Sequence, residues 1–259
     1  MDFVAPFEFL VPIFLVGGLA TYLEWQFPRR RVLVSPGRWL ASVMLLLCST
    51  LLGVLILPVA GYAVARLSES VGSGLLNIGD FPIWLNAALT ILALDFIAFL
   101  MHWLLHRYHG LWRIHRVHHS DNIVSASTSF LHHPFEALMV QAIGLFLTPI
   151  LGLQAEGLLI FTGIQFTINI WHHSNIASFR GQYWLGFVIF TPEEHRVHHS
   201  AEKRHYNRNL GLIFTIWDRI FGTYIKEKDL DRSIRYGLDP QEWDYPDTIT
   251  SLIIDPFRK

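Results

Sequence analysis

A histidine motif that occurs twice constrains the fold of this chain more than any other feature. Residues 115–120 read His-Arg-Val-His-His-Ser, and residues 195–200 repeat the same letters. Upstream, His102 and His106 form a His-x3-His pair, and a helix would place both rings on one face. Imidazole is the commonest metal ligand in proteins. We therefore expect the fold to bring these distant segments together as two halves of one metal site.

The composition favours a membrane protein. Of the 259 residues, 52% are hydrophobic and only 16% are charged, which is unusually apolar for a soluble domain. The net charge of −1 gives no electrostatic reason to expect nucleic acid as a partner. The single cysteine, Cys48, can form no disulfide within the chain.

Long apolar runs predict membrane helices. Residues 7–27, 39–65 and 82–105 are each long enough to cross a hydrocarbon core of about 30 Å as a helix. No basic region precedes the first run and no small-residue cleavage site follows it, so we expect a retained span. Pro58 is expected to bend the second run. The third run delivers the His-x3-His pair to the membrane boundary.

Two shorter apolar runs, 135–153 and 157–171, predict a helical hairpin because only a tight link separates them. The hairpin would leave His133 at its entry and His173 at its exit on the same side of the membrane. Residues 183–190 are apolar but too few to span, so we expect an interfacial helix there, with a strand as the alternative.

Basic residues predict the orientation of these helices. Residues 29–31 are all arginine and Arg38 follows them, whereas the loop 66–81 is poor in Lys and Arg. By the positive-inside rule, the first loop and the metal site lie on the cytoplasmic side, and the N-terminus lies outside. Residues 226–259 are charged and contain prolines, which predicts a cytoplasmic surface tail.

The candidate ligands are more numerous than one ion requires. In a His-x2-His-His motif the first two histidines share a helix face and the third flanks it, so one turn can serve two ions. Imidazole suits zinc, iron, copper and nickel, so the ligand type does not name the metal. We expect the remaining histidines, which are His109, His132, His172 and His205, to be interfacial or hydrogen-bonding residues. The candidate metal ligands are His102, His106, His115, His118, His119, His133, His173, His195, His198 and His199, and all but His133 and His173 are also our candidate catalytic residues.

Our candidates for indirect cofactor binding are Asp95, Glu136 and Asn175. Each would hold a metal-binding histidine in the right orientation by a hydrogen bond. Such partners fix the imidazole tautomer and tune the metal. Asp95 shares a helix face with the His-x3-His pair, and ionisable residues inside a membrane are costly and usually functional. A hydrogen-bonded core aspartate is the alternative. Asp121, Glu193 and Glu194 lie close to the motifs as well, where a solvated loop is the alternative.

Taken together, these motifs resemble the fatty acid hydroxylase (sterol desaturase) superfamily over about residues 95–224. Members are integral-membrane, non-haem di-iron oxygenases that use O2 and two electrons to hydroxylate or desaturate lipids. The resemblance implies two iron ions as cofactor, O2 as co-substrate, a lipid substrate from the bilayer and an external electron carrier. The matching segments are His102-x3-His106, 111–121, His133-Pro134-Phe135-Glu136, His173-Ser174-Asn175, 195–199 and Trp217-Asp218-Arg219-Ile220-Phe221-Gly222-Thr223.

Two positions depart from the pattern of many relatives, at Trp103 and at Leu131-His132, near where a substrate head group would be read. Fatty acyl chains, sterols, alkylglycerols and carotenoids are all compatible substrates. An acidic electron carrier could dock on basic residues, although a solvated surface is the alternative reading of these charges. The basic residues are Arg196, Lys203, Arg204 and Arg208.

We therefore predict an all-α integral-membrane helical bundle with about three full spans, a helical hairpin and a cytoplasmic histidine-rich metal-binding cap. Residues 1–81 would hold the N-terminal spans and an external loop, 82–224 the hydroxylase-like catalytic domain, and 225–259 the cytoplasmic tail. The predicted function is hydroxylation or desaturation of a lipid C–H bond. Alternatives are a membrane zinc hydrolase, in which the same histidines activate water, and a non-catalytic metal-binding membrane protein.

Overall fold

The computed structural model describes residues 6–32, 35–53, 57–79, 81–226, 234–239 and 248–258. Across this part of the chain the regular structure is entirely helical, and strand-like pairing is limited to isolated bridges such as the one between Ile189 and Phe214. The all-α prediction is therefore confirmed. The alternative strand at 183–190 is replaced by a short helix, α8 (Gln182–Leu185), followed by turns.

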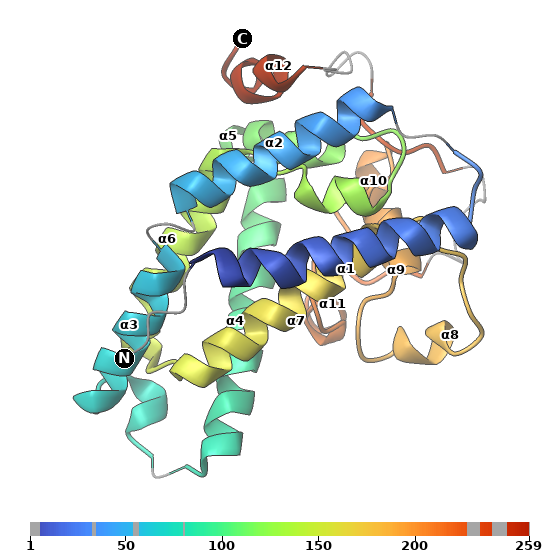
Figure 1. Cartoon of the computed structure of the whole chain (residues 1–259). Helices are drawn as coiled ribbons and strands as arrows, with labels where there is room; N and C mark the ends of the chain where they lie inside the picture. The colour runs from blue at the N-terminus through green and yellow to red at the C-terminus, as the bar shows by residue number, and fades with distance from the viewer. Residues whose placement is uncertain are drawn as a thin grey trace.

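The N-terminal third forms three helices, α1 (Pro6–Gln26), α2 (Pro36–Gly53) and α3 (Leu57–Ser70). The apolar run 39–65 was expected as one helix, yet it is shared between α2 and α3, which point in different directions (Figure 1). Residues 54–56, where the two helices meet, lie outside the described residues. A short 3₁₀ helix, η1 (Leu75–Asn77), leads to the next long helix.

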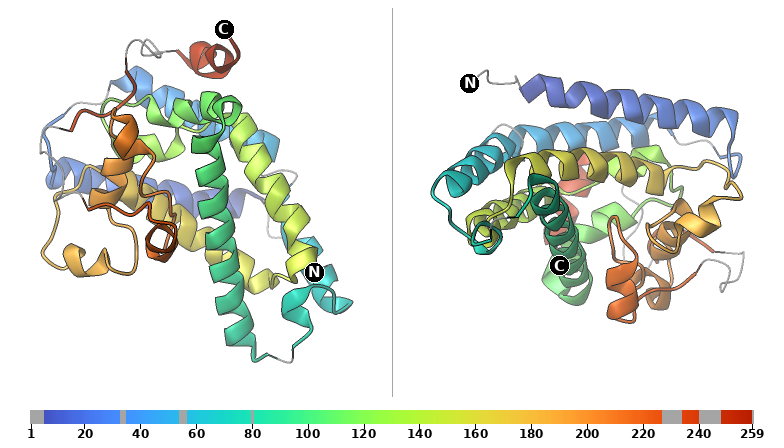
Figure 2. Two further views of the ribbon diagram at one scale, coloured as in Figure 1. Left: turned by 180° about the vertical axis from the view of Figure 1, so that it is seen from behind. Right: turned by 90° about the horizontal axis from the view of Figure 1, so that it is seen from below.

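Two helices of the described part, α4 (Ile83–Arg107) and α6 (Pro134–Leu151), are long and apolar enough to cross a membrane, judged by length and composition alone. Of the three predicted full spans, this criterion supports only residues 82–105, as α4, whereas α6 was predicted as one arm of the hairpin. In Figures 1 and 2, α4 runs across the direction of α1 and α2, with its C-terminal end beside α5 (His109–His119).

The predicted hairpin is present as α6 and α7 (Ala155–His173). Gly152 closes α6 with a φ of 70°, a left-handed conformation that glycine adopts without strain. Gly157 lets α7 approach α4 closely, because a Cβ added there would lie 2.8 Å from the Cβ of Thr90. The hairpin thus returns its C-terminal end to the His-bearing end of α4.

Short helices at that end form the cap over the hairpin. They are η2 (Ala126–Phe130), α8, α9 (Pro192–His198), α10 (Lys203–Tyr206) and α11 (Ile216–Ile220). Helix α9 begins with a capping box between Thr191 and Glu194, with Pro192 at its first position. These contacts stabilise the start of the short helix that carries the second histidine motif.

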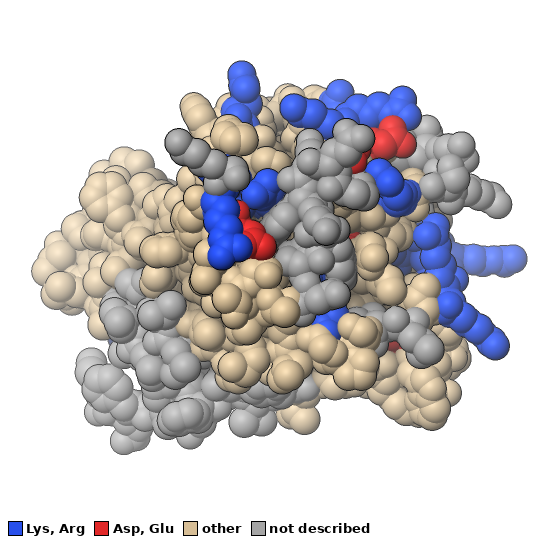
Figure 3. Space-filling view, turned by 90° about the horizontal axis from the view of Figure 1, so that it is seen from above, with Lys and Arg blue, Asp and Glu red and all other residues tan. Residues whose placement is uncertain are grey.

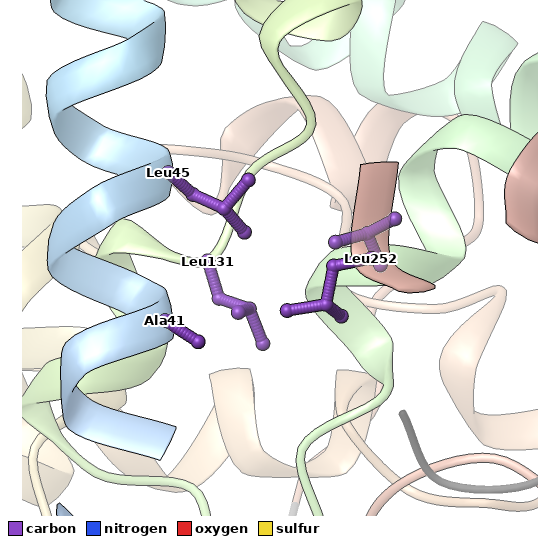
Figure 4. Packing of buried hydrophobic residues seen from close by; sticks show 5 residues of the cluster. Ala41, Leu45, Leu131 and Leu252 are labelled. Atoms are coloured by element: carbon purple, nitrogen blue, oxygen red, sulfur yellow. The ribbon is translucent and has the colours of Figure 1, made fainter. Parts of the chain in front are cut away.

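The segment predicted as a C-terminal tail contains a helix, α12 (Ile249–Ile254), followed by η4 (Asp255–Phe257). Leu252 is fully buried against Leu45 of α2, Val117 of α5 and Leu131, as Figure 4 shows in part. Its burial removes apolar surface from water and joins the end of the chain to the cap. The sequence analysis did not predict this helix, because the segment 226–259 as a whole is rich in charged residues.

Candidate metal centre

The first histidine cluster lies at the C-terminal end of α4. It gathers residues from α4, α5 and α9, and their ligand atoms all lie within 4.8 Å of one another. The Nε2 atoms of His102 and His115 are 3.1 Å apart. The Nε2 atoms of His119 and His198 are buried and have no hydrogen-bond partner among the described residues. The members of the first cluster are His102, His106, His115, His119 and His198.

The second histidine cluster consists of His118, His173, His195 and His199, from α5, α7 and α9. His173 Nε2 faces the Nε2 atoms of the other three at 3.1, 2.9 and 3.0 Å respectively. His195 Nε2 and His199 Nε2 are 3.2 Å apart. Four imidazoles from three helices therefore point at one place.

These distances fit a shared metal ion. One proton on His173 Nε2 could serve only one of its three neighbours, so hydrogen bonds alone do not explain the second cluster. A metal–nitrogen bond of about 2.1 Å places neighbouring ligands about 3.0 Å apart at a right angle. The chemistry of the donors fits as well, since neutral imidazole binds several transition metals.

Hydrogen bonds from the Nδ1 atoms fix the tautomer of several ligands. The Nδ1 atoms of His102, His173 and His198 lie 2.8, 2.7 and 3.0 Å from the carbonyl oxygens of Leu210, Asn169 and Arg208, in that order. A carbonyl can only accept, so each Nδ1 carries the proton and donates. The Nε2 lone pair of each ring is therefore free to face its cluster, as metal ligation requires.

Burial also keeps the cap histidines neutral. Desolvation, and then the neighbouring histidines, lower the pKa of these side chains well below the ordinary value for histidine. The neutral ring is the form that binds a metal ion. The residues concerned are His118, His119, His195, His198 and His199.

Each copy of the repeated motif contributes to both clusters. In α5, His115 and His119 belong to the first cluster and His118 to the second. In the second copy the assignment is exchanged, since His195 and His199 belong to the second cluster and His198 to the first. Residues four apart share a helix face, and the intervening histidine is turned toward the neighbouring cluster. The two clusters consequently lie side by side. The rings of His119 and His199, one from each cluster, are stacked with their centroids 4.7 Å apart.

His133 is the one predicted ligand that the structure places in neither cluster. It is the N-cap residue of α6, where its Nδ1 accepts a hydrogen bond from the backbone N–H of Phe135 at 3.1 Å. Its Nε2 lies 3.1 Å from the carbonyl oxygen of Ile253 and donates to it. Both ring nitrogens are thus bound to the backbone, so the prediction of a metal ligand here is wrong.

Glu136 lies where a residue that orients a ligand should be. Its Oε1 accepts hydrogen bonds from Nδ1 of His115 at 3.0 Å and from Nδ1 of His132 at 3.1 Å. The carboxylate is buried in the first turn of α6. His132, which was expected to have no part in the site, forms a third group with these two residues.

Asp95 and Asn175 make no hydrogen bond to a clustered histidine in the described part of the chain, so neither orients one of these rings directly. Asp95 accepts hydrogen bonds from the backbone N–H groups of Ile213 and Phe214 and from Nε1 of Trp217. It therefore holds the chain near Leu210, whose carbonyl binds His102. The Asn175 side chain binds the backbone of residue 30 instead.

Asp218 completes the anchoring of this loop and was missed as a site residue. Its carboxylate accepts hydrogen bonds from the backbone N–H groups of Leu210 at 2.8 Å and Gly211 at 2.6 Å. Desolvation raises its pKa above the ordinary value for aspartate. The only signal in the sequence was its place in the segment 217–223, which resembles the superfamily.

The N-terminal helices also support the site, through one arginine and one glutamate. Arg38 of α2 is 3% exposed, donates a hydrogen bond to Ser120 Oγ at 2.7 Å and lies 3.4 Å from Asp121. Glu24 of α1 accepts hydrogen bonds from the backbone N–H groups of Ala126 and Asn175. Both contacts fix chain segments that directly follow ligand helices.

Arg196 is also buried, with 2% of its surface exposed, so it cannot belong to a docking surface for an electron carrier. Its guanidinium donates to the carbonyl oxygen of Ser174 at 2.8 Å. The other three basic residues of that prediction, Lys203, Arg204 and Arg208, are exposed.

Two aromatic rings cover the first cluster. Trp112 and Tyr206 are stacked, with centroids 4.8 Å apart, and Trp112 lies 5.0 Å from His106 and 5.2 Å from His119. Such large apolar faces exclude water from the rings beneath them.

Comparison with known proteins gives one consistent result. Residues 87–223, more than half of the chain, match the fatty acid hydroxylase family. An alkylglycerol monooxygenase of Homo sapiens is 28% identical over 157 residues, which cover 60% of this chain and 33% of that protein. An ornithine lipid hydroxylase of Rhizobium tropici is 28% identical over 145 residues, covering 56% of this chain and 43% of that protein.

A lathosterol oxidase of Mus musculus is 25% identical over 153 residues, covering 57% of this chain and 49% of that protein. The chain thus spans about a third to a half of the length of these relatives. No solved structure matches it significantly. The matched residues contain both histidine clusters and the loop that Asp95 and Asp218 anchor, and this chain belongs to the fatty acid hydroxylase family.

Proposed function

We propose that this protein is a membrane lipid oxygenase that holds two iron ions and uses O2 to hydroxylate or desaturate a lipid C–H bond. The observation that carries the proposal is the pair of adjacent histidine clusters, with five and four converging ligands. The named relatives, an alkylglycerol monooxygenase, an ornithine lipid hydroxylase and a lathosterol oxidase, support a lipid substrate.

In this proposal each cluster holds one ion. Iron is preferred to zinc because of the family, since an all-imidazole donor set suits both metals. When bound, the iron pair would supply the oxidation of an unactivated C–H bond with O2 and two electrons. In this proposal the electrons come from a separate carrier.

The chain's own residues would do the remaining work. The carbonyl oxygens of Leu210, Asn169 and Arg208 hold three ligand rings in one tautomer. Trp112 and Tyr206 keep water from the first cluster. Seven of the nine clustered histidines are buried and His102 and His106 are partly buried, so the site largely excludes water, which limits side reactions of an oxidising centre.

We further propose a multi-pass topology with the metal centre on the cytoplasmic side. The basic loop 29–31 supports this orientation, because the Asn175 side chain, two residues after a ligand of the second cluster, binds the backbone of residue 30. Lys and Arg are also more prominent than Asp and Glu on the face shown in Figure 3, which is the upper face in Figure 1. A substrate would then enter laterally from the bilayer, toward the end of α4 that carries His102.

The test is metal analysis of the purified protein, followed by turnover with a lipid extract. We expect about two irons per chain, and one oxygen atom from labelled O2 in a hydroxylated product or a new double bond in a desaturated one. Comparative lipid analysis of an expressing host and an empty-vector host would identify the product. Zinc in place of iron, with lipid hydrolysis that proceeds without O2, would overturn the proposal in favour of a membrane zinc hydrolase.

A further inference from the structure

His132 contacts His118 of the second histidine cluster directly and reaches His115 of the first cluster through Glu136, without belonging to either cluster. Its Nδ1 lies 3.1 Å from Glu136 Oε1, the same oxygen that accepts from His115 of the first cluster. Its ring is stacked on His118 of the second cluster, with centroids 4.2 Å apart and planes at 13°. We propose that His132 is a positioning residue that couples the geometry of the two metal sites. This inference rests on the proposed function only in that the clusters hold metal.

The first half of the coupling runs through Glu136. Both N–H donors bind the same oxygen, while Oε2 is buried with no hydrogen-bond partner among the described residues. His132 therefore donates one of the two hydrogen bonds that direct this carboxylate in the described structure. If that contact were lost, the carboxylate could turn toward other partners, and the hydrogen bond that orients His115 would weaken.

The second half of the coupling is the stack on His118. The Nδ1 of His118 is buried and has no hydrogen-bond partner within the described part of the chain. In this it differs from the Nδ1 atoms of His102, His173 and His198, which each donate to a carbonyl. No carbonyl or carboxylate therefore holds this ring in its plane. Of the described rings around His118, only that of His132 is stacked on it, so we expect this contact to set the plane of the ring and thus where His118 Nε2 points.

The position of His132 makes this coupling testable without disturbing the core. Its side chain is 31% exposed, so substitutions can be accommodated there. The two contacts can also be separated chemically. His132→Phe keeps a flat ring for the stack and removes the donor, whereas His132→Asn keeps an N–H donor near the position of Nδ1 and removes the ring.

The experiment loads each variant with iron and records its Mössbauer spectrum and the rate at which a chelator removes metal. We expect His132→Phe to alter the signal of one iron and His132→Asn that of the other, while His132→Ala alters both. Removal of the affected iron should become about 10-fold faster, the lower end of the effect known for residues that orient ligands. His109→Ala, an exposed substitution at the start of α5, is the matched control and should change neither measurement.

Two results would overturn the proposal. One is a His132→Phe and a His132→Asn variant that both keep the wild-type spectrum and removal rate. The other is the same change in both, because a merely structural role would not distinguish the two sites. If the wild-type protein holds zinc instead, the proposed function fails, and the chelator rates measured with zinc still decide the role of His132.

Discussion

The partners of the two ring nitrogens distinguish some of the clustered histidines from His133. In His173 and His198 one nitrogen donates to a carbonyl and the other faces a cluster. In His133 both nitrogens bind the backbone. His205 is buried too, but its Nδ1 lies 3.1 Å from Ser200 Oγ, which assigns it to the cap rather than to the metal centre.

Replacing His118 by Ala should remove one ligand of the second cluster and leave the first cluster complete. We expect the metal content to fall from about two ions per chain to about one, with turnover abolished. Metal analysis and a lipid turnover assay would measure both, with His109→Ala as the control. A His118→Ala variant with full metal content and activity would contradict the assignment of the second cluster.

Replacing His133 by Ala should lower the stability of the fold without changing the metal content. The N-cap hydrogen bond to Phe135 and the contact with Ile253 would be lost, which lowers stability by about 1 kcal/mol, a typical value for a helix cap. The metal content should remain that of the wild type. Thermal unfolding together with metal analysis would detect this, and loss of a metal ion would restore His133 as a ligand.

At the scale of elements, α12 shows how a polar segment can carry one decisive apolar residue. Leu252 is fully buried among residues of α2 and α5, whereas Ile254 on the same helix is 41% exposed. Replacing Leu252 by Ala should therefore cost about 2–5 kcal/mol, as for other buried leucines. Ile254→Ala is the control and should cost far less. Equal shifts in thermal unfolding would mean that α12 does not pack as described.

The surface formed by α8 and α11 bears on the predicted interfacial helix. Trp184 and Val188 are 71% and 62% exposed, and Lys226 lies over the rings of Tyr183 and Phe187. Exposed aromatic residues beside cations are typical of a membrane interface. Phe221 after α11 packs on Phe99 of α4, beside a candidate span.

A spin label at Val188→Cys, in a Cys48→Ser background and in vesicles, should therefore be more accessible to O2 than to a water-soluble nickel complex. Arg204→Cys is the control, since the Arg204 side chain is 77% exposed on α10 near other charged residues. We expect the opposite preference there. Equal, water-like accessibility at both positions would show that α8 does not touch lipid.

For the whole molecule, the two clusters tie α4, α5, α7 and α9 together. Metal should thus stabilise the fold, because ions bind the assembled site and not the unfolded chain. Free metal at about 1,000 times its dissociation constant contributes about 4 kcal/mol per ion, or on the order of 10 °C in thermal midpoint. Chelation should lower the midpoint by that amount, and added metal should restore it. An unchanged midpoint would argue against metal bound between these helices.

The local features of this protein were determined by its sequence alone. Apolar runs fixed α4, α6 and α7, and the spacing of His102, His106 and the two repeated motifs fixed which rings share a helix face. Both are short-range properties, since periodicity and length follow from neighbours within a turn or two. Nine of the ten predicted ligands consequently lie in the two clusters.

Only the tertiary structure decided which segments complete the site. His133 and His173 were both predicted as ligands, yet the first caps α6 and the second joins three other imidazoles. Arg38 and Glu24 reach the cap from helices far away in sequence, and His132 acquires its contacts only when α6 packs beside α5. Such pairings depend on how helices pack against one another, which is a property of the whole chain, whereas ligand type and spacing are properties of a single turn.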